Sequence, residues 1–290
     1  MFKNFIVATD ISPASFAVVE SLSGLTAYGA EQCLLLQCLS FGDASSTALA
    51  YDVEPLKQML NEQKERLQKD GFVVEARTVY GSPKQEINRI AVEEDYSLIV
   101  VGAQGHSLVE EKLLGGVAYG IINKTVKPVL VVPVEKKQGE EDACEVMRCS
   151  FKDHVLFATD FSEIADNAFT YVEQLVADGA RKVTLIYVQD KDMIEGYLEE
   201  RLEELKKHSQ DRLENLKQVL LEKGGPQVDI QVGYGSPFQE ISRLVEEDNV
   251  QLVVMGTQGR GFLGEFFLGS VSHNVARHSV APVLLVPGLR

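Results

Sequence analysis

The chain has 290 residues, 45% hydrophobic and 24% charged, which is the composition of a soluble globular protein with room for two ordinary domains. Its formal net charge of −15 disfavours nucleic acid and anionic lipid as partners. No apolar run approaches the roughly 20 residues that span a bilayer, and the opening "MFKNFIVATD" lacks the features of a signal peptide. We therefore expect a cytoplasmic protein with reduced cysteines and no membrane contact.

The sequence repeats itself once. The segments "FIVATDISPAS" at 5–15 and "VYGSPKQEINRI" at 79–90 return as "VLFATDFSEIA" at 155–165 and "GYGSPFQEISRL" at 233–244. "KPVLVVP" likewise returns as "APVLLVP". The copies lie about 150 residues apart, far beyond the roughly 20–50 residues of a solenoid repeat. This pattern predicts two equivalent domains at 1–134 and 151–290, with a polar linker at 135–150.

The second copy alternates short apolar runs with segments of helical period. The runs, predicted as strands, lie at 154–159, 182–188, 228–232, 251–255 and 282–286. A helix is predicted over 162–179, between the N-cap residue Ser162 and Gly179. A second, strongly charged helix is predicted over 194–223, and it could contact a partner helix. Strands that are apolar on both faces and alternate with helices indicate an α/β fold, so we predict two doubly wound, five-stranded parallel-sheet domains.

A glycine-rich loop in the second copy separates the fourth predicted strand from the last helix. Gly256 and Gly259 let the backbone approach a ligand without a Cβ in the way. A helix that begins at Gly269-Ser270 presents free N–H groups, which favour an anion. The first strand ends at Asp160, and ligands of open parallel sheets bind beyond the carboxyl ends of the strands. A carboxylate for ribose hydroxyls and an anion site together predict a nucleotide site.

Other chemistry has weaker support in the sequence. The P-loop signature is absent, and a literal G-x-G-x-x-G from Gly259 to Gly264 follows the fourth strand rather than the first. We find no spacing of metal ligands and no catalytic constellation, so we expect no metal site and no catalytic residue. Plain structural interpretations stay open: Asp160 could be a local turn residue, Ser270 only an N-cap, and Arg260 a solvated side chain.

The spacing Gly256-x2-Gly259-x9-Gly269-Ser270, with the strand-one Asp and the closing "PVLLVP", resembles the ATP-binding universal stress proteins. The resemblance covers nearly the whole chain, twice. It implies the universal stress protein fold, which is similar to that of the adenine-nucleotide alpha-hydrolases, and a site for ATP, ADP or AMP, with or without Mg²⁺. The residues that the resemblance assigns to the second-domain site are Ala158, Thr159, Asp160, Val188, Gly256, Gly259, Arg260, Gly269, Ser270, Val271 and Ser272.

The first copy departs from this pattern where phosphate would lie. Gly116 replaces Ser270 and Ala118 replaces Ser272, so two hydroxyls are lost, while Glu110 adds a carboxylate in the place of Gly264. Each charge-assisted hydrogen bond that is lost costs about 1.5–3 kcal/mol. We therefore expect the first site to be empty, weak, or limited to a less charged ligand. Its residues would be Thr9, Asp10, Gly102, Gly105, Gly115 and Gly116.

The resemblance implies a nucleotide-binding regulatory or sensor protein of the stress response, and the residues suggest no enzyme. Two alternatives stay open: a slow ATPase that uses Asp160 and a bound metal, and a nucleotide-independent scaffold. The resemblance also implies that the last strands of the two domains, 129–132 and 283–286, pair across a pseudo-two-fold axis within one chain. A homodimer remains compatible with that arrangement.

Overall fold

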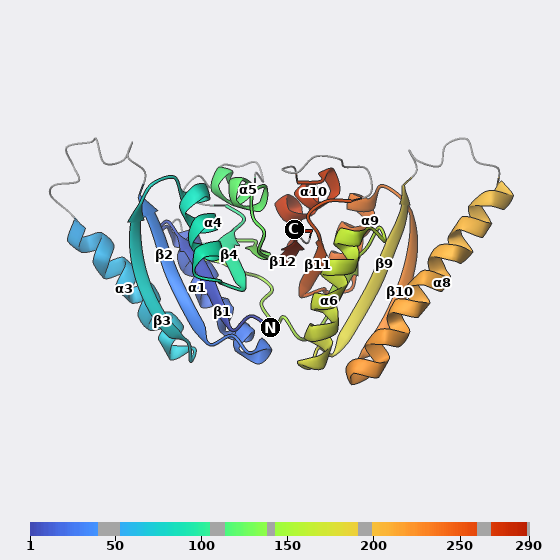
Figure 1. Cartoon of the computed structure of the whole chain (residues 1–290), viewed down its shortest axis with the longest axis horizontal. Helices are drawn as coiled ribbons and strands as arrows, with labels where there is room; N and C mark the ends of the chain where they lie inside the picture. The colour runs from blue at the N-terminus through green and yellow to red at the C-terminus, as the bar shows by residue number, and fades with distance from the viewer. Residues whose placement is uncertain (40–52, 105–113, 138–142, 191–198, 260–267, 289–290) are drawn as a thin grey trace. The chain divides into compact units, whose positions relative to one another are not determined.

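Figure 1 shows the computed structural model of the chain, which describes residues 1–39, 53–104, 114–137, 143–190, 199–259 and 268–288. These residues divide into two compact units, Met1–Cys149 and Ser150–Arg290. Each unit contributes five parallel strands and the helices that connect them.

The first unit orders its strands as β3-β2-β1-β4-β5, and all neighbours in this order are parallel. The strands are β1 Asn4–Thr9, β2 Gln32–Leu39, β3 Val73–Tyr80, β4 Leu98–Gly102 and β5 Val129–Val132. The helices are α1 Pro13–Glu20, the 3-10 helix η1 Leu22–Tyr28, α3 Val53–Lys69, α4 Pro83–Glu93 and α5 Gly116–Ile122.

The second unit repeats this arrangement as β10-β9-β8-β11-β12, again with parallel neighbours. The strands are β8 Val155–Ala158, β9 Lys182–Asp190, β10 Gln227–Gly235, β11 Leu252–Gly256 and β12 Val283–Val286. The helices are α6 Glu163–Ala177, α8 Glu199–Gly224, α9 Pro237–Glu247 and α10 Ser270–His278. The five apolar runs predicted as strands are thereby confirmed.

Helix ends follow local chemistry. The Ser162 hydroxyl caps α6 by accepting a hydrogen bond from the Ala165 amide, at 3.2 Å. Gly179, with φ of 101°, follows the end of α6 in a backbone conformation that L side chains rarely adopt. The charged helix is α8, although residues 194–198 of its predicted span lie outside the described residues. None of the helices in the described ranges is both long and apolar enough to cross a membrane.

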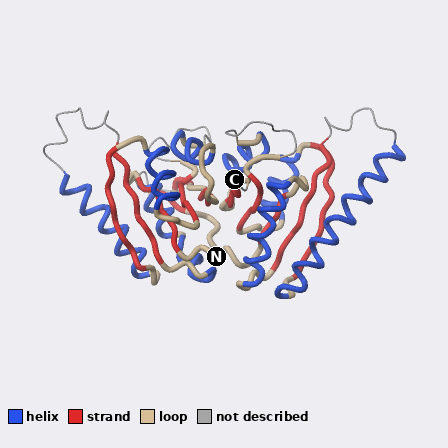
Figure 2. Tube along the Cα trace, in the orientation of Figure 1, coloured by secondary structure: helices blue, strands red, loops and turns tan. Residues whose placement is uncertain are grey.

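Helices cover both faces of the strands in each unit, as Figure 2 shows. In the second unit α6 packs on α8, and α9 packs on α10. Among the strands between these helices, β8, β11 and β12 are buried along their whole length. Phe157 of β8, for example, contacts Phe169 of α6 with ring centroids 5.4 Å apart. The predicted doubly wound α/β fold is therefore confirmed.

Two parts of the segment predicted as a linker, 135–150, form secondary structure. Two short strands, β6 Glu135–Lys136 and β7 Cys144–Glu145, pair antiparallel, and β7 contacts α1. These contacts group the segment with the first unit. The sequence of this segment is polar and does not alternate apolar with polar residues, so it does not predict so short a pair of strands.

Candidate functional site

The order of the strands fixes where a ligand can approach the second unit. From β8 the chain continues to β9 on one side, whereas β11 lies on the other side of β8. In an open α/β sheet, ligands bind beyond the carboxyl ends of the strands at the point where the order reverses. That point lies between the ends of β8 and β11. The sequence ends β8 just before Asp160 and begins the glycine-rich loop at the end of β11.

The turn after β8 holds Asp160 by local hydrogen bonds. Asp160 Oδ1 accepts from the amide and the hydroxyl of Ser162, at 3.1 and 2.6 Å. The Thr159 hydroxyl accepts from the Phe161 amide at 2.9 Å, and Phe161 has a left-handed backbone with φ of 59°. The interpretation of Asp160 as a turn residue is therefore confirmed for one carboxylate oxygen. Ala158 and Thr159 are both buried, at 8% exposure.

The position of Asp160 Oδ2 explains why residue 259 is a glycine. A Cβ on Gly259 would lie only 2.5 Å from Asp160 Oδ2, so a larger residue would displace the carboxylate or the loop. A Cβ on Gly256 would similarly lie 2.8 Å from Cγ2 of Ile164 in α6. Gly259 therefore permits a close approach of the loop to the turn after β8, and Gly256 permits a close approach of the end of β11 to α6. Arg260, the next residue of the loop, lies outside the described residues.

The helix that follows the loop leaves its first turn without a side-chain cap. Gly269 is the N-cap residue, and its amide donates to the Thr257 carbonyl at 2.8 Å. The first bond within α10 runs from the His273 amide to the Gly269 carbonyl. Ser270 is thus an exposed first residue of the helix, and its interpretation as an N-cap is wrong. An uncapped first turn with a positive dipole end is favourable to an anion.

Ser272 and the two valines take different places. Ser272 is 4% exposed, and its hydroxyl donates to the Gly256 carbonyl at 2.8 Å, which ties α10 to the end of β11. With its proton used there, the hydroxyl would not donate to a phosphate in this arrangement. Val271 is half-buried in the first turn of α10. Val188 of β9 is half-buried too, and its Cγ2 lies 3.3 Å from the position of a Cβ on Gly233.

The first unit repeats the strand-one turn. Asp10 Oδ1 accepts from the amide and hydroxyl of Ser12, at 3.1 and 2.5 Å, and Ile11 has φ of 62°. The Thr9 hydroxyl accepts from the Ile11 amide at 3.0 Å. Asp10 is exposed, whereas Asp160 is half-buried.

The loop end of the first unit differs more. Gly115 again caps a helix, and its amide donates to Ala103 at 2.8 Å. Gly116 has no atom within 4 Å of a Cβ, so a serine would fit there and packing does not exclude it. Ala118, 3% exposed, cannot tie its helix to the preceding strand as Ser272 does. Gly102 ends β4, whereas Gly105 and Glu110 lie outside the described residues.

Two groups beside these turns were not predicted. In the second unit the Phe161 ring contacts Tyr187 of β9, with centroids 4.9 Å apart, and the guanidinium carbon of Arg212 lies 3.9 Å from the Phe161 ring centroid. In the first unit the Thr9 hydroxyl donates to Oε1 of the fully buried Gln63 at 2.8 Å. The sequence singles out neither group, because the residues that meet are far apart in the chain.

Burial, and then the nearby Arg277, lower the pKa of His273 in α10, which favours its neutral form. Within the described ranges, no three His, Cys, Asp or Glu side chains gather in a way that could hold a metal ion.

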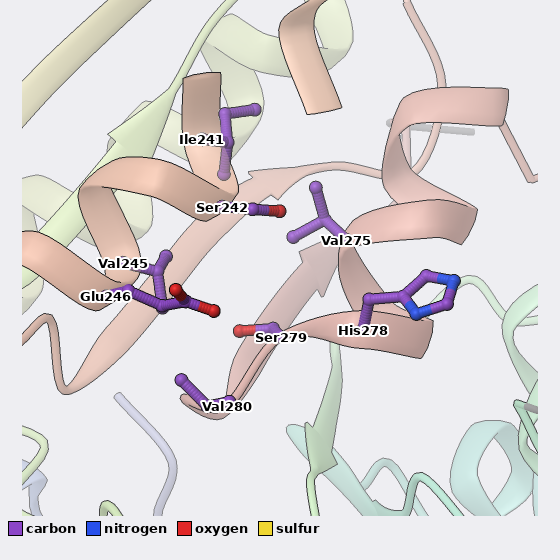
Figure 3. Close-up of a pocket in the computed structure, with 8 residues that line it drawn as sticks. All are labelled: Ile241, Ser242, Val245, Glu246, Val275, His278, Ser279 and Val280. Carbon is purple, nitrogen blue, oxygen red and sulfur yellow. The ribbon is translucent and has the colours of Figure 1, made fainter. Parts of the chain in front are cut away.

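A small hollow lies elsewhere in the second unit, between α9 and α10 (Figure 3). Ser242, Val275 and Val280 are among the residues that line it. Its empty space is about 210 Å³, and part of that space is open solvent. It reaches the last turn of α10 and the start of β12. It therefore lies toward the amino ends of the strands, whereas Asp160 lies at their carboxyl ends. We do not assign the candidate site to it.

Comparisons with known proteins agree with this architecture. A model of the universal stress protein family matches residues 1–133 and again residues 152–287. The universal stress protein MJ0577 of Methanocaldococcus jannaschii is 31% identical over 151 residues, which cover 46% of this chain and 93% of that protein. The universal stress protein YxiE of Bacillus subtilis is 31% identical over 144 residues, covering 46% of this chain and 97% of that protein.

A solved structure extends the likeness over both units. The crystal structure of a universal stress protein from Archaeoglobus fulgidus matches with a TM-score of 0.65 and 25% identity, and the match covers 98% of this chain and 96% of the other. Together with the repeated fold and the glycine loop beside Asp160, the two family matches establish that this chain belongs to the universal stress protein family.

Proposed function

We propose that the second domain binds an adenine nucleotide, ATP or ADP, and that the protein acts as a nucleotide-responsive regulator in a stress response. The observation that carries the proposal is the approach of Gly259 to Asp160 Oδ2 where the strand order reverses. A loop backbone held this close to a carboxylate leaves no room for a side chain between them. Family membership adds support for the stress-related role, because the chain carries the family's domain twice.

The chemistry of the surrounding groups fits the two ends of a nucleotide. Asp160 is a carboxylate that could accept hydrogen bonds from ribose hydroxyls. The first turn of α10, with Ser270 exposed beside its N–H groups, would take the phosphates. Val188, with Ala158 and Thr159, would face the adenosine. In this proposal Ser272 holds the loop and helix together rather than contacting phosphate.

Isothermal titration of the full chain with ATP and with adenosine tests the proposal. Ser270→Ala removes a hydroxyl beside the phosphates, so we expect roughly tenfold weaker ATP binding and unchanged adenosine binding. Gly269→Val should weaken both ligands, because a Cβ there already lies 3.4 Å from the Thr257 carbonyl oxygen. Gly116→Ala, at an open position of the first domain, is the control. Unchanged ATP affinity in both second-domain variants would sink the assignment.

Phosphate release separates the regulator from the alternatives. A regulator should hold ATP for hours with little release of phosphate. Turnover of roughly one per second or faster would favour the ATPase instead. If Asp160→Asn then abolished that turnover, Asp160 would be assigned to catalysis. A chain that binds no nucleotide at all would support the scaffold.

A further inference from the structure

The turn that carries Asp160 needs support from outside itself. Phe161 has a left-handed backbone, with φ of 59°, and such a conformation costs a non-glycine residue roughly 1–2 kcal/mol. Residues in this region persist when the surrounding structure holds them in place. The hydrogen bonds from the Phe161 amide to Thr159 and from the Ser162 amide to Asp160 act within the turn. The Phe161 ring adds contacts with residues outside the turn.

Within the described part of the second unit, β9 and α8 contact that ring. Tyr187 of β9 lies against it at a centroid distance of 4.9 Å and an interplanar angle of 35°. Arg212 of α8 places its guanidinium carbon 3.9 Å from the ring centroid, which is well within the range of a cation–π contact. Arg212 and Phe161 are both half-buried, so solvent does not fully screen this contact. Helix α8 thus touches the residue next to Asp160.

The first domain makes the equivalent link with different chemistry. Met59 of the first domain corresponds to Arg212, because each directly precedes a buried leucine of its helix. Gln37 corresponds to Tyr187 by the register of the sheet. There, Gln63 of α3 reaches the turn instead, through its hydrogen bonds to Thr9 and Ser15 at 2.8 and 3.2 Å. In both domains, then, a side chain from the long helix, α3 or α8, contacts the turn after the first strand.

We infer that Arg212 is a positioning residue for the second-domain nucleotide site: acting through the Phe161 ring, it holds the turn that aims the Asp160 carboxylate. This inference rests on the proposed function. Because coupling between a bound ligand and a protein element is reciprocal, a nucleotide at Asp160 should in turn stabilise the part of α8 around Arg212. Helix α8 is then the element through which the second domain reports its ligand.

Titration of the full chain with both adenosine and ATP tests the inference. Arg212→Met, which installs the first-domain residue, should weaken the two ligands by the same factor, about three- to tenfold. Equal losses are expected because positioning acts on Asp160, which the two ligands share. Arg212→Lys should keep part of the affinity, and Phe161→Ile should lower it as Arg212→Met does. Once Phe161→Ile is present, Arg212→Met should have little further effect.

Arg181→Met is the matched control. It removes the same charge from an exposed ion pair with Asp153, just before β9 and therefore at the amino ends of the strands, away from Asp160. The affinities for adenosine and ATP should both stay unchanged. Hydrogen exchange adds a readout that is independent of affinity. ATP should slow exchange in α8 around Arg212 in the wild-type chain and do so much less in Arg212→Met.

The outcomes separate this inference from the proposed function. A wild-type chain that binds neither adenosine nor ATP overturns both. If the wild-type chain binds and Gly269→Val weakens binding, but Arg212→Met leaves adenosine affinity unchanged, only the positioning role is overturned. A loss for ATP that far exceeds the loss for adenosine would mean that Arg212 contacts phosphate directly, and it would also overturn the positioning role.

Discussion

The two domains share the turn after their first strand and differ in the side chains that support it and in the first turn of the helix after the glycine loop. Asp10 and Asp160 each accept two hydrogen bonds from the serine two residues later, and a left-handed residue follows each of them. The helices after the glycine loops then diverge, with Ser270 in one domain and Gly116 in the other. The turn is therefore common to both domains, and the first residue of the helix after the glycine loop distinguishes them.

The divergence extends beneath the turn. The first domain has a buried polar cluster of Thr9, Ser15 and Gln63, whereas the second has the contact of Phe161 with Tyr187 and Arg212. Hydrogen-bonded clusters hold one geometry when all partners are present and are costly when one is missing. An aromatic ring against a guanidinium offers a contact with less strict geometry. Duplicated domains can thus support the same backbone with different side chains.

The largest expected effect comes from filling the space between Gly259 and Asp160. Gly259→Val places atoms within 2.5 Å of Asp160 Oδ2, so we expect ATP affinity to fall by about a hundredfold or more. Gly116→Ala is the control in the first domain, because nothing lies within 4 Å of its Cβ. Calorimetry measures both. Equal effects of the two substitutions would remove the distinction between the domains.

Gln63→Leu breaks the polar cluster of the first domain. It installs an aliphatic residue where the second domain has Leu216, and it leaves buried Thr9 without its acceptor on α3. We expect the first unit to lose about 1–3 kcal/mol of stability. Hydrogen exchange of β1 amides in the full chain measures the loss. Gln58→Leu, on the exposed face of α3, should have little effect, and a comparable loss there would show that the cluster is not responsible.

Buried His154 should make the second unit sensitive to acid. Its ring nitrogens lie 3.0 Å from the Asp248 carbonyl oxygen and 2.8 Å from the Thr184 hydroxyl, and burial lowers its pKa, although the Asp248 carbonyl opposes that shift. The unfolded chain, with a histidine pKa of about 6.5, then binds more protons than the folded one just below that pH. Stability should therefore fall as the pH drops below about 6.5.

The first domain supplies the control for this pH dependence. Asn4 occupies the position of His154 and donates to the Asp95 carbonyl at 2.9 Å, without a titrating group. Urea unfolding of the full chain followed between pH 7.5 and pH 5.5, roughly the range around a histidine pKa, should show a smaller acid loss in His154→Asn. An unchanged pH profile in that variant would assign the acid sensitivity to other groups.

The smallest effect is expected at Ser272. Ser272→Ala removes one hydrogen bond to the Gly256 carbonyl and copies Ala118 of the first domain, so it should cost about 1 kcal/mol of stability. Because the hydroxyl acts on the loop, any loss of affinity should be equal for ATP and adenosine. A loss confined to ATP would mean that Ser272 contacts phosphate after all.

The sequence predicts the strands, the helix ends and the loop glycines because their determinants are local. Ser162 caps its own helix, and Gly179 takes a backbone conformation that a side chain would resist. The links beneath the turn depend on residues far apart in the chain, such as Gln63 with Thr9 and Arg212 with Phe161. Spacing carries no signal for such pairs. Ser272 was predicted as a phosphate contact because its spacing does not reveal that its hydroxyl bonds to Gly256.

The location of the nucleotide is the central claim, and photolabelling tests it most directly. The full chain is irradiated with 8-azido-ATP and digested, and the labelled peptides are identified by mass spectrometry, with unlabelled ATP as competitor. We predict competed labelling in the second domain, on peptides from the end of β9 around Val188 or from the turn at Asp160. Competed labelling confined to the first domain, or label that ATP does not displace, would contradict the account.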